Sequence, residues 1–250
     1  MTPRRRARTW PILPRSFYAR PTLEVARDLL GKVLVHHADD GVTAGAIVEV
    51  EAYIGEDDPA CHAAPGPTRR NAPLYGDPGR AYVYLNYGVH YLVNAVTERA
   101  GIPAAALIRA LEPVDGIALM QRRRGCRQGG SARPVFDLCR GPGNLSRAMG
   151  IGPDLNVADL TRAGRGVGRI WIEDRGLPVT ASAWTPRVGI RVGTDRLWRC
   201  CLAGHPAVSG SGRVFWGTDR GRGGFSRRTV AENPPRPRTS PRKPAPSPDG

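Results

Sequence analysis

Long apolar runs are missing from this chain, and their absence limits where the protein can work. No stretch approaches the roughly 18 apolar residues that a membrane-spanning helix needs. The amino terminus, residues 1–8, is basic but lacks the apolar run of a signal peptide. We therefore expect a cytoplasmic protein with no membrane partner.

Cysteines are few, and their spacing suggests no bound group. The five cysteines are odd in number and form no C-x-x-C pair. Such a pattern predicts neither a disulfide framework nor a zinc site. The adjacent Cys61 and His62 could suggest a pair of metal ligands, but no other candidate ligand stands at structural-zinc spacing. We expect no metal and no cofactor.

Acidic residues are scarce relative to basic ones. The chain has 37 lysines and arginines against 22 acids, a formal charge of +15, and its only lysines are Lys32 and Lys243. Such a balance favours a polyanionic partner, most commonly nucleic acid. Arginine-rich composition can also reflect coding bias, so charge alone does not identify the partner.

The length of 250 residues, with 40% hydrophobic residues, is enough to bury one sizeable core. We expect a basic flexible arm over residues 1–15 and a single folded domain over residues 16–217. Residues 218–250 are rich in Arg, Pro, Ser and Gly and contain almost no large apolar residues. This composition predicts a disordered basic tail.

The periodicity of the apolar residues predicts an α+β fold, with helices around a mixed, largely antiparallel curved sheet and a protruding β-hairpin. The expected strands, besides the hairpin, are 32–36, 43–51, 104–109, 168–173, 187–192 and 197–202. The first expected helix starts with Thr22 as its N-cap and is ended by Gly31. The other expected helices run over about 113–124 and from a cap at Asn144 to Met149, closed by Gly150. Residues 55–79 form either a long functional loop or a poorly ordered one; residues 125–134 form a variable basic loop.

The segment Val48–Tyr53 carries two acids on a strand. Glu49 and Glu51 alternate with Val48 and Val50, so both carboxylates should leave one face and both valines the other. A carboxylate placed there can point into a cavity. The plain structural alternative for Glu51 is pairing with an arginine at the end of the strand.

A second segment brings tyrosines together. Tyr82 and Tyr84 fall on one side of a strand, the chain breaks at Asn86-Tyr87-Gly88, and a second strand follows to Val96. This pattern predicts a β-hairpin with an aromatic residue at its tip. Aromatics beside an acid, in an arginine-rich chain, suggest an enzyme that stacks a base and hydrolyses a bond next to it.

Three runs, EAYIGEDDPACHA, AYVYLNYGVHYLVN and LIRALEP, resemble in order and spacing the alkyladenine (methylpurine) DNA glycosylase family. The resemblance extends from about residue 16 to about residue 217. It implies a base-excision-repair enzyme whose partner is damaged double-stranded DNA, located in the nucleoid if the source is bacterial. Such an enzyme flips alkylated adenine or guanine, hypoxanthine or ethenoadenine out of the duplex and hydrolyses the N-glycosidic bond with a Glu-activated water.

The resemblance also implies a monomer that is a monofunctional N-glycosyl hydrolase. No lysine lies in the matching runs, so Schiff-base lyase chemistry has no candidate residue. A non-catalytic protein that binds distorted DNA or RNA through the same hairpin and charge is the alternative from another functional class.

Site residues follow from the same resemblance. The residues implied for catalysis are Glu51 as the acid, Arg109 as a residue that helps hold the water, and Val188, whose backbone carbonyl holds the same water. The residues implied for the base pocket are Tyr53, His62 and Tyr84, which sandwich the base, and Asn94, which crowds the 2-amino group of guanine. For Arg109, His62 and Asn94 the alternatives are a surface arginine, an exposed loop histidine and a residue of a strand-end turn.

DNA contacts are implied for the hairpin tip and for one loop. Tyr87 matches the residue that fills the gap left by the flipped nucleotide. Arg69, Arg70 and Asn71 match a segment near the DNA backbone, although the loop differs in length. The sequence Gly141-Pro142-Gly143-Asn144 opens a helix and could hold a phosphate, though most glycine-rich turns do not.

Overall fold

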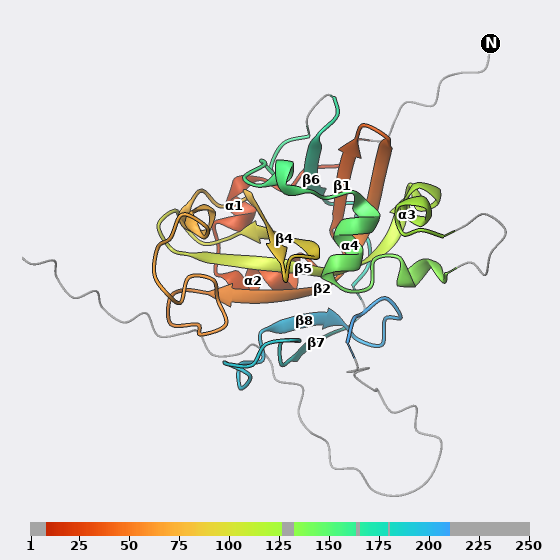
Figure 1. Ribbon diagram of the computed structural model, residues 1–250. Helices are drawn as coiled ribbons and strands as arrows, with labels where there is room; N and C mark the ends of the chain where they lie inside the picture. The colour runs from red at the N-terminus through yellow and green to blue at the C-terminus, as the bar shows by residue number, and fades with distance from the viewer. Residues whose placement is uncertain (1–8, 127–132, 164–165, 180, 211–250) are drawn as a thin grey trace, which may run out of the picture.

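The protein folds around one curved antiparallel sheet (Figure 1). The computed structural model describes residues 9–126, 133–163, 166–179 and 181–210, so the predicted tail at 218–250 lies outside the described residues. The strands are β1 (Val33–Ala38), β2 (Gly41–Ile54), β3 (Ala81–Asn86), β4 (His90–Val96), β5 (Ala104–Asp115), β6 (Arg169–Glu173), β7 (Ser182–Thr185) and β8 (Arg199–Leu202). The helices are α1 (Arg15–Tyr18), α2 (Thr22–Asp28), α3 (Ile117–Arg123) and α4 (Pro142–Met149), with short 3-10 turns at Ala72–Tyr75, Val135–Asp137 and Pro153–Leu155. The predicted α+β class and largely antiparallel sheet are confirmed, and no described helix has the length and apolarity to span a bilayer.

Strand β2 lies at the centre of the sheet. The strand order is β3-β4-β5-β2-β1-β6, with β8 paired to both β2 and β7. One edge of β2 pairs with β5 along most of its length, whereas the other pairs first with β1, over Gly41–Ala46, and then with β8, over Glu49–Glu51. Figure 1 shows β8 and β7 in blue and teal alongside β2. Strands therefore pair with Glu49–Glu51 on both edges, and both acids are fully buried.

The sheet section made of β2, β3, β4 and β5 has one face in the main core and the other on a cavity. Successive strand residues point to opposite sides, so the two sets alternate along each strand. The core set is Val50, Ala52, Ala81, Val83, Val93, Ala95, Ala106 and Ile108, which share a hydrophobic cluster with residues of α2 and α4. The cavity set is Tyr53, Tyr82, Tyr84, Leu92, Asn94, Ala105, Leu107 and Arg109.

The pairing of β2 with β5 is irregular around Glu49. The register shifts on both sides of this residue, so that Val48 on β2 and Arg109 on β5 have no residue directly opposite. Such β-bulges bend a strand and re-aim its side chains. As a result Val50 packs in the main core but Val48 packs in a separate small cluster. The prediction that the two valines share a face is therefore wrong, whereas Glu49 and Glu51 do share one, since Arg109 binds both.

Helix α2 begins at Thr22 and is followed by Gly31 at a φ of 77°, in agreement with the predicted helix. Its start differs in one respect. The side chain of Thr22 does not cap the helix; instead the Glu98 carboxylate accepts hydrogen bonds from the backbone N–H of Thr22, at 2.6 Å, and from its hydroxyl, at 2.9 Å. A carboxylate at a helix start satisfies free N–H groups and complements the helix dipole.

Helix α4 begins three residues earlier than the sequence predicted, since its N-cap is Gly141 and not Asn144. Asn144 lies inside the helix, and its Nδ2 donates to the carbonyl of Arg140 at 2.7 Å, so the prediction that Asn144 caps the helix is wrong. Pro142 is the first residue of the helix. Proline is favoured there because it has no backbone N–H, and an N–H at this position would have no acceptor within the helix. The predicted end is confirmed, since Gly150 follows the helix with a φ of 70°.

Two further element predictions were wrong. Strand β5 continues to Asp115, because the first half of β2 offers it a pairing edge, and α3 therefore starts at Ile117 and not near residue 113. No strand forms over 187–192. Strand β7 ends at Thr185, and the chain after it is a loop along the cavity.

The last residues of the predicted flexible arm are part of the folded domain. Ile12 forms a bridge with Glu173 of β6, and the N–H of Leu13 donates to the carbonyl of Ile172 at 2.9 Å. Leu13 is buried in the main core. Within the described residues, the arm therefore covers the edge of β6 from residue 11 onward.

Candidate active site

A cavity of about 410 Å³ opens on the face of the sheet opposite the core. This volume lies in the range of roughly 300–1,000 Å³ that is usual for sites that bind small molecules. Besides the strand residues given above, its walls come from the loop 60–62, from the loop 188–192 and from Pro142 at the start of α4. Leu74 and, at the hairpin end, Asn86 and Tyr87 also line it. Helix α4 can come this close because residue 143 is glycine; a Cβ there would lie 2.6 Å from the His90 ring of β4.

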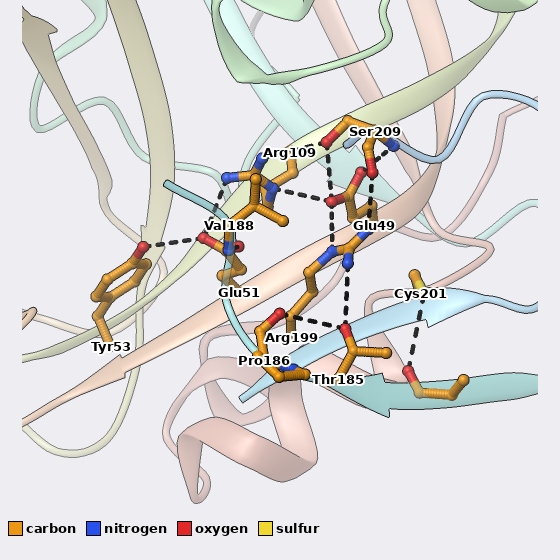
Figure 2. A network of polar contacts seen from close by, with 11 residues as sticks. Glu49, Glu51, Tyr53, Arg109, Thr185, Pro186, Val188, Arg199, Cys201 and Ser209 are labelled. Atoms are coloured by element: carbon orange, nitrogen blue, oxygen red, sulfur yellow. Dashed lines mark hydrogen bonds and ion pairs between the residues drawn. The ribbon is translucent and has the colours of Figure 1, made fainter. Parts of the chain in front are cut away.

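Glu51 is fully buried behind the cavity wall, with three hydrogen-bond donors around it (Figure 2). The hydroxyl of Tyr53 donates to Oε2 at 2.9 Å and Nη1 of Arg109 donates to the same oxygen at 3.1 Å. The backbone N–H of Val188 donates to Oε1 at 2.6 Å. The three donors come from β2, β5 and the 188–192 loop, and all three residues line the cavity. The structure therefore brings together all three residues that the sequence implied for catalysis.

Arg109 connects Glu51 to a second buried acid. Its Nε donates to Oε1 of Glu49 at 2.9 Å, and its Nη2 donates to the hydroxyl of Ser209 at 3.2 Å. Burial lowers the pKa of Arg109, but the charges of Glu51 and Glu49 outweigh this effect and raise it above its usual value. Figure 2 shows Arg199 on the far side of Glu49, with its Nε donating to the same Oε1 at 2.7 Å. Arg109 is therefore not the surface arginine of the alternative interpretation.

Aromatic side chains form one wall of the cavity. The His62 and Tyr84 rings have centroids 4.4 Å apart, and Tyr84 lies 5.2 Å from Tyr82. Nδ1 of His62 is hydrogen-bonded to the hydroxyl of Tyr82 at 2.8 Å. Burial, with a smaller effect of Arg70, lowers the pKa of His62, which favours the neutral ring near pH 7. The partly buried His62 is thus part of the pocket and not an exposed loop residue.

Tyr53 and Asn94 complete the predicted pocket. Burial and the negative charge of Glu51 raise the pKa of Tyr53, which keeps its hydroxyl a donor to Glu51. The guanidinium of Arg187 lies 4.6 Å from the centroid of the Tyr53 ring. Tyr53 lines the cavity and Arg187 does not, so the Tyr53 ring separates the Arg187 guanidinium from the cavity. Asn94 is buried, and its Nδ2 donates to the carbonyl of Tyr82 at 2.9 Å.

The side chain of Asn71, a residue with an implied DNA contact, lies inside the loop that carries His62; the DNA contact itself remains a prediction. The side chain is buried; its Nδ2 donates to the carbonyls of His62 and Gly66 at 2.7 and 2.9 Å, and its Oδ1 accepts from the N–H of Thr68. These bonds use most of the hydrogen-bonding capacity of the amide. We therefore assign Asn71 to holding the loop that carries His62.

Tyr87 stands at the tip of the β3–β4 hairpin with 89% of its surface exposed. The predicted hairpin is present, and Tyr87 and Gly88 have φ values of 47° and 69°, the positive values that a tight hairpin turn requires. A tyrosine at positive φ is uncommon and carries a cost in backbone strain. Arg69 and Arg70 are exposed and line a groove along β3 next to this hairpin. Their contacts with DNA, and a phosphate at the start of α4, remain predictions.

Several residues of the site carried no recognisable sequence signal. Arg199 and Ser209 reach Glu49 from β8 and from the segment after it. Asp58 and Arg187 form a buried ion pair between two loops of the cavity. For Glu49 there was one signal: its two-residue spacing from Glu51 predicted that both carboxylates lie on the same face of the strand. Among the described residues, no cluster of His, Cys, Asp or Glu could hold a metal ion.

Comparison with known proteins identifies the family. The methylpurine-DNA glycosylase family (MPG) matches residues 16–206 of this chain. A protein of Methanocella arvoryzae named "Putative 3-methyladenine DNA glycosylase" is 48% identical over 202 residues, which are 80% of this chain and 96% of that protein. Proteins of the same name from Chlorobaculum tepidum and Burkholderia lata are each 45% identical, over 77% and 80% of this chain and 88% and 93% of their own lengths. The chain therefore belongs to the methylpurine-DNA glycosylase family.

Proposed function

We propose that this chain is a monofunctional DNA glycosylase of base-excision repair that hydrolyses the N-glycosidic bond of damaged purines flipped out of duplex DNA. The observation that carries the proposal is the setting of Glu51. It is a fully buried carboxylate that accepts hydrogen bonds from Tyr53, Arg109 and the Val188 N–H, and these three residues line the aromatic cavity. The family supports the class of enzyme, and the net charge of +15 supports a DNA partner.

In the proposed reaction, the oxygen of a water molecule attacks C1′ of the sugar while the bond from C1′ to the purine nitrogen breaks. The purine leaves with the bonding electron pair, and the proton of the water passes to Glu51. A carboxylate can accept about four hydrogen bonds, and protein donors supply three to Glu51, so one acceptor position remains for the water. The negative carboxylate also stabilises the positive charge that develops on the sugar.

A base in the cavity would contact the rings of Tyr53, His62 and Tyr84. Stacking on aromatic side chains contributes roughly 1–3 kcal/mol per base and tolerates different base shapes. This supports a range of substrates that includes alkylated adenine and guanine, hypoxanthine and ethenoadenine. The relatives named for 3-methyladenine make that base the first to test.

Water, and not an amine, is the proposed nucleophile. No lysine lines the cavity in the described part of the chain, and Lys32 is bound to Asp174 at 2.6 Å, away from the site. The enzyme should therefore release the base and leave an intact abasic strand.

The test is single-turnover base release from methylated duplex DNA and from a labelled duplex that contains hypoxanthine. Wild-type protein should release 3-methyladenine, and strand breaks should appear only after alkali treatment. Glu51→Gln should slow release by at least about 100-fold, the low end of general-base contributions, and keep duplex binding. Glu112→Gln, which alters an exposed acid on β5, is the matched control and should keep the wild-type rate.

Two results would overturn the proposal. If Glu51→Gln released the base at a rate within about threefold of wild type, Glu51 would not be the general base. A wild-type protein that binds damaged duplexes but releases no base from any of them would favour a binding protein instead.

A further inference from the structure

A second carboxylate, Glu49, is as deeply buried as Glu51, and the proposed reaction does not use it. Its Oε1 accepts hydrogen bonds from Nε of Arg109 at 2.9 Å, from Nε of Arg199 at 2.7 Å and from the hydroxyl of Ser209 at 2.9 Å. Its Oε2 accepts from the backbone N–H of Ser209 at 2.6 Å. A buried carboxylate with four donors is held in one position.

Arg109 transmits that position to Glu51. One guanidinium group donates to Glu49 through Nε, to Ser209 through Nη2 and to Glu51 through Nη1 (Figure 2). Since the guanidinium is planar and rigid, two fixed contacts determine where the third N–H points. The contact with Glu51 is therefore set from the side of Glu49.

The charges of this cluster balance. Two acids, Glu49 and Glu51, face two arginines, Arg109 and Arg199, and all four side chains are buried. The other titratable or charged groups around Glu51 are Tyr53, Tyr84 and Arg187, the last paired with Asp58; around Glu49 the further group is Cys201. Without Glu49, Arg109 and Arg199 would leave an excess positive charge beside Glu51. A positive excess favours the ionised form of an acid and makes it a weaker base.

We propose that Glu49 is a positioning residue for base excision, which fixes Arg109 against Glu51 and supplies the negative charge that keeps Glu51 a sufficiently strong base. Ser209 belongs to the same hydrogen-bond network. It donates to Glu49 through both its N–H and its hydroxyl, and its hydroxyl accepts from Arg109. Ser209 lies beyond residue 206, where the match to the family ends. The inference rests on the proposed function of Glu51.

The experiment measures single-turnover release of hypoxanthine by the full chain as a function of pH for wild type, Glu49→Gln, Glu49→Asp and Ser209→Ala. Glu49→Gln keeps the shape and removes the charge. Its plateau rate should fall about tenfold or more, and the pH at which the rate reaches half its plateau should fall by at least about 0.5 unit. The direction follows because Glu51, the proposed base, then loses its proton at lower pH.

The other two variants keep the charge and disturb the geometry. Glu49→Asp shortens the reach to Arg109, and Ser209→Ala removes one hydroxyl from the network. Both should lower the plateau rate, by about threefold to tenfold for Ser209→Ala, with the half-plateau pH unchanged. If Glu49 had a purely structural role, the half-plateau pH would not fall in Glu49→Gln while staying unchanged in Glu49→Asp and Ser209→Ala.

Circular dichroism and binding to undamaged duplex establish that each variant is folded. A folded Glu49→Gln with the wild-type pH profile, or the same shift in all three variants, would overturn the inference. If Glu49→Gln does not fold, Glu49→Asp and Ser209→Ala decide: slower release at unchanged half-plateau pH supports the inference, and wild-type rates overturn it. Loss of release in Glu51→Gln shows independently that the proposed function holds.

Discussion

Arg187 and Asp58 form an ion pair in which both side chains are fully buried. Nη2 donates to Oδ1 at 2.7 Å and Nη1 donates to Oδ2 at 2.5 Å. Nη1 also donates to the carbonyl of Ala52 on β2 at 3.1 Å, and the guanidinium stacks on Tyr53. The pair thus connects the loop before His62 with the segment that places Val188, so that two walls of the cavity share one anchor.

Breaking this pair on one side should destabilise the protein strongly. Asp58→Asn leaves a buried guanidinium without its counter-charge, a change that typically costs about 3–5 kcal/mol. For a domain of this size that corresponds to a fall in Tm of roughly 10 °C, at about 2–4 °C per kcal/mol. Thermal unfolding at pH 7 measures the effect. The double variant Asp58→Asn/Arg187→Met should be more stable than the sum of the two single changes predicts, since it leaves neither charge unpaired.

The control is an exposed ion pair of similar composition. Asp28 accepts from Arg20 at 2.9 Å, and both side chains are about one-third exposed. Asp28→Asn should cost less than about 1 kcal/mol, because water screens exposed pairs. If Asp28→Asn and Asp58→Asn lowered thermal stability equally, the burial of the Arg187–Asp58 pair would not increase its contribution to stability.

The sequence predicted the elements whose signals are local. The hairpin around Tyr87, the helix from Thr22 and the strand near 168–173 each follow from periodicity and turn residues, and each is present. The orientation of Glu51 followed from the same alternation. The resemblance to a family then pointed to side chains that the fold does bring to one cavity, including His62 and Tyr84.

Elements and contacts that depend on distant partners were not predictable. The apolar residues of 187–192 suggested a strand, but β8 takes the available edge of β2, and that segment becomes a cavity loop. The bulges at Val48 and Arg109 come from the pairing of two strands and have no local signal. Ser209 is about 160 residues from Glu49 along the chain, so only the folded structure reveals their contact.

His36 should make stability depend on pH. Burial lowers the pKa of this histidine, and the opposing hydrogen bond to the carbonyl of Met149, at 2.7 Å, does not compensate. The unfolded chain therefore binds more protons than the folded one below the ordinary histidine pKa of about 6.5, and stability falls as pH decreases from there towards the folded-state pKa. Above that range the contribution is fully present.

Thermal unfolding between pH 7.5 and pH 5 measures this dependence. One proton changes the free energy of unfolding by at most about 1.4 kcal/mol per pH unit, so the contribution to Tm is a few degrees. The decrease should be smaller in His36→Gln than in wild type. His37→Gln, at the partly exposed neighbouring position, is the control and should retain the wild-type decrease. If both variants lose Tm in parallel with wild type, His36 is not the titrating group.

Tyr87→Ala should separate base flipping from bond hydrolysis. The ring is exposed at the hairpin tip and lies on a strained backbone, which supports its proposed role as the wedge that fills the gap in the base stack. Its removal should reduce the fraction of flipped nucleotide and slow hypoxanthine release from a well-paired duplex by about tenfold or more, since unstacking costs a few kcal/mol. The defect should shrink when hypoxanthine lies in a mismatch or a bulge, where less stacking must be broken.

Single-turnover release on paired, mismatched and bulged duplexes provides the measurement, with two reference variants. Glu51→Gln should be equally inactive on all three, because the proposed chemical step is the same in each. Val167→Ala, which truncates an exposed apolar side chain beside β6, should behave as wild type on all three. A Tyr87→Ala variant with no defect on the paired duplex, or with the same fractional defect on every substrate, would show that the tyrosine does not act as the wedge.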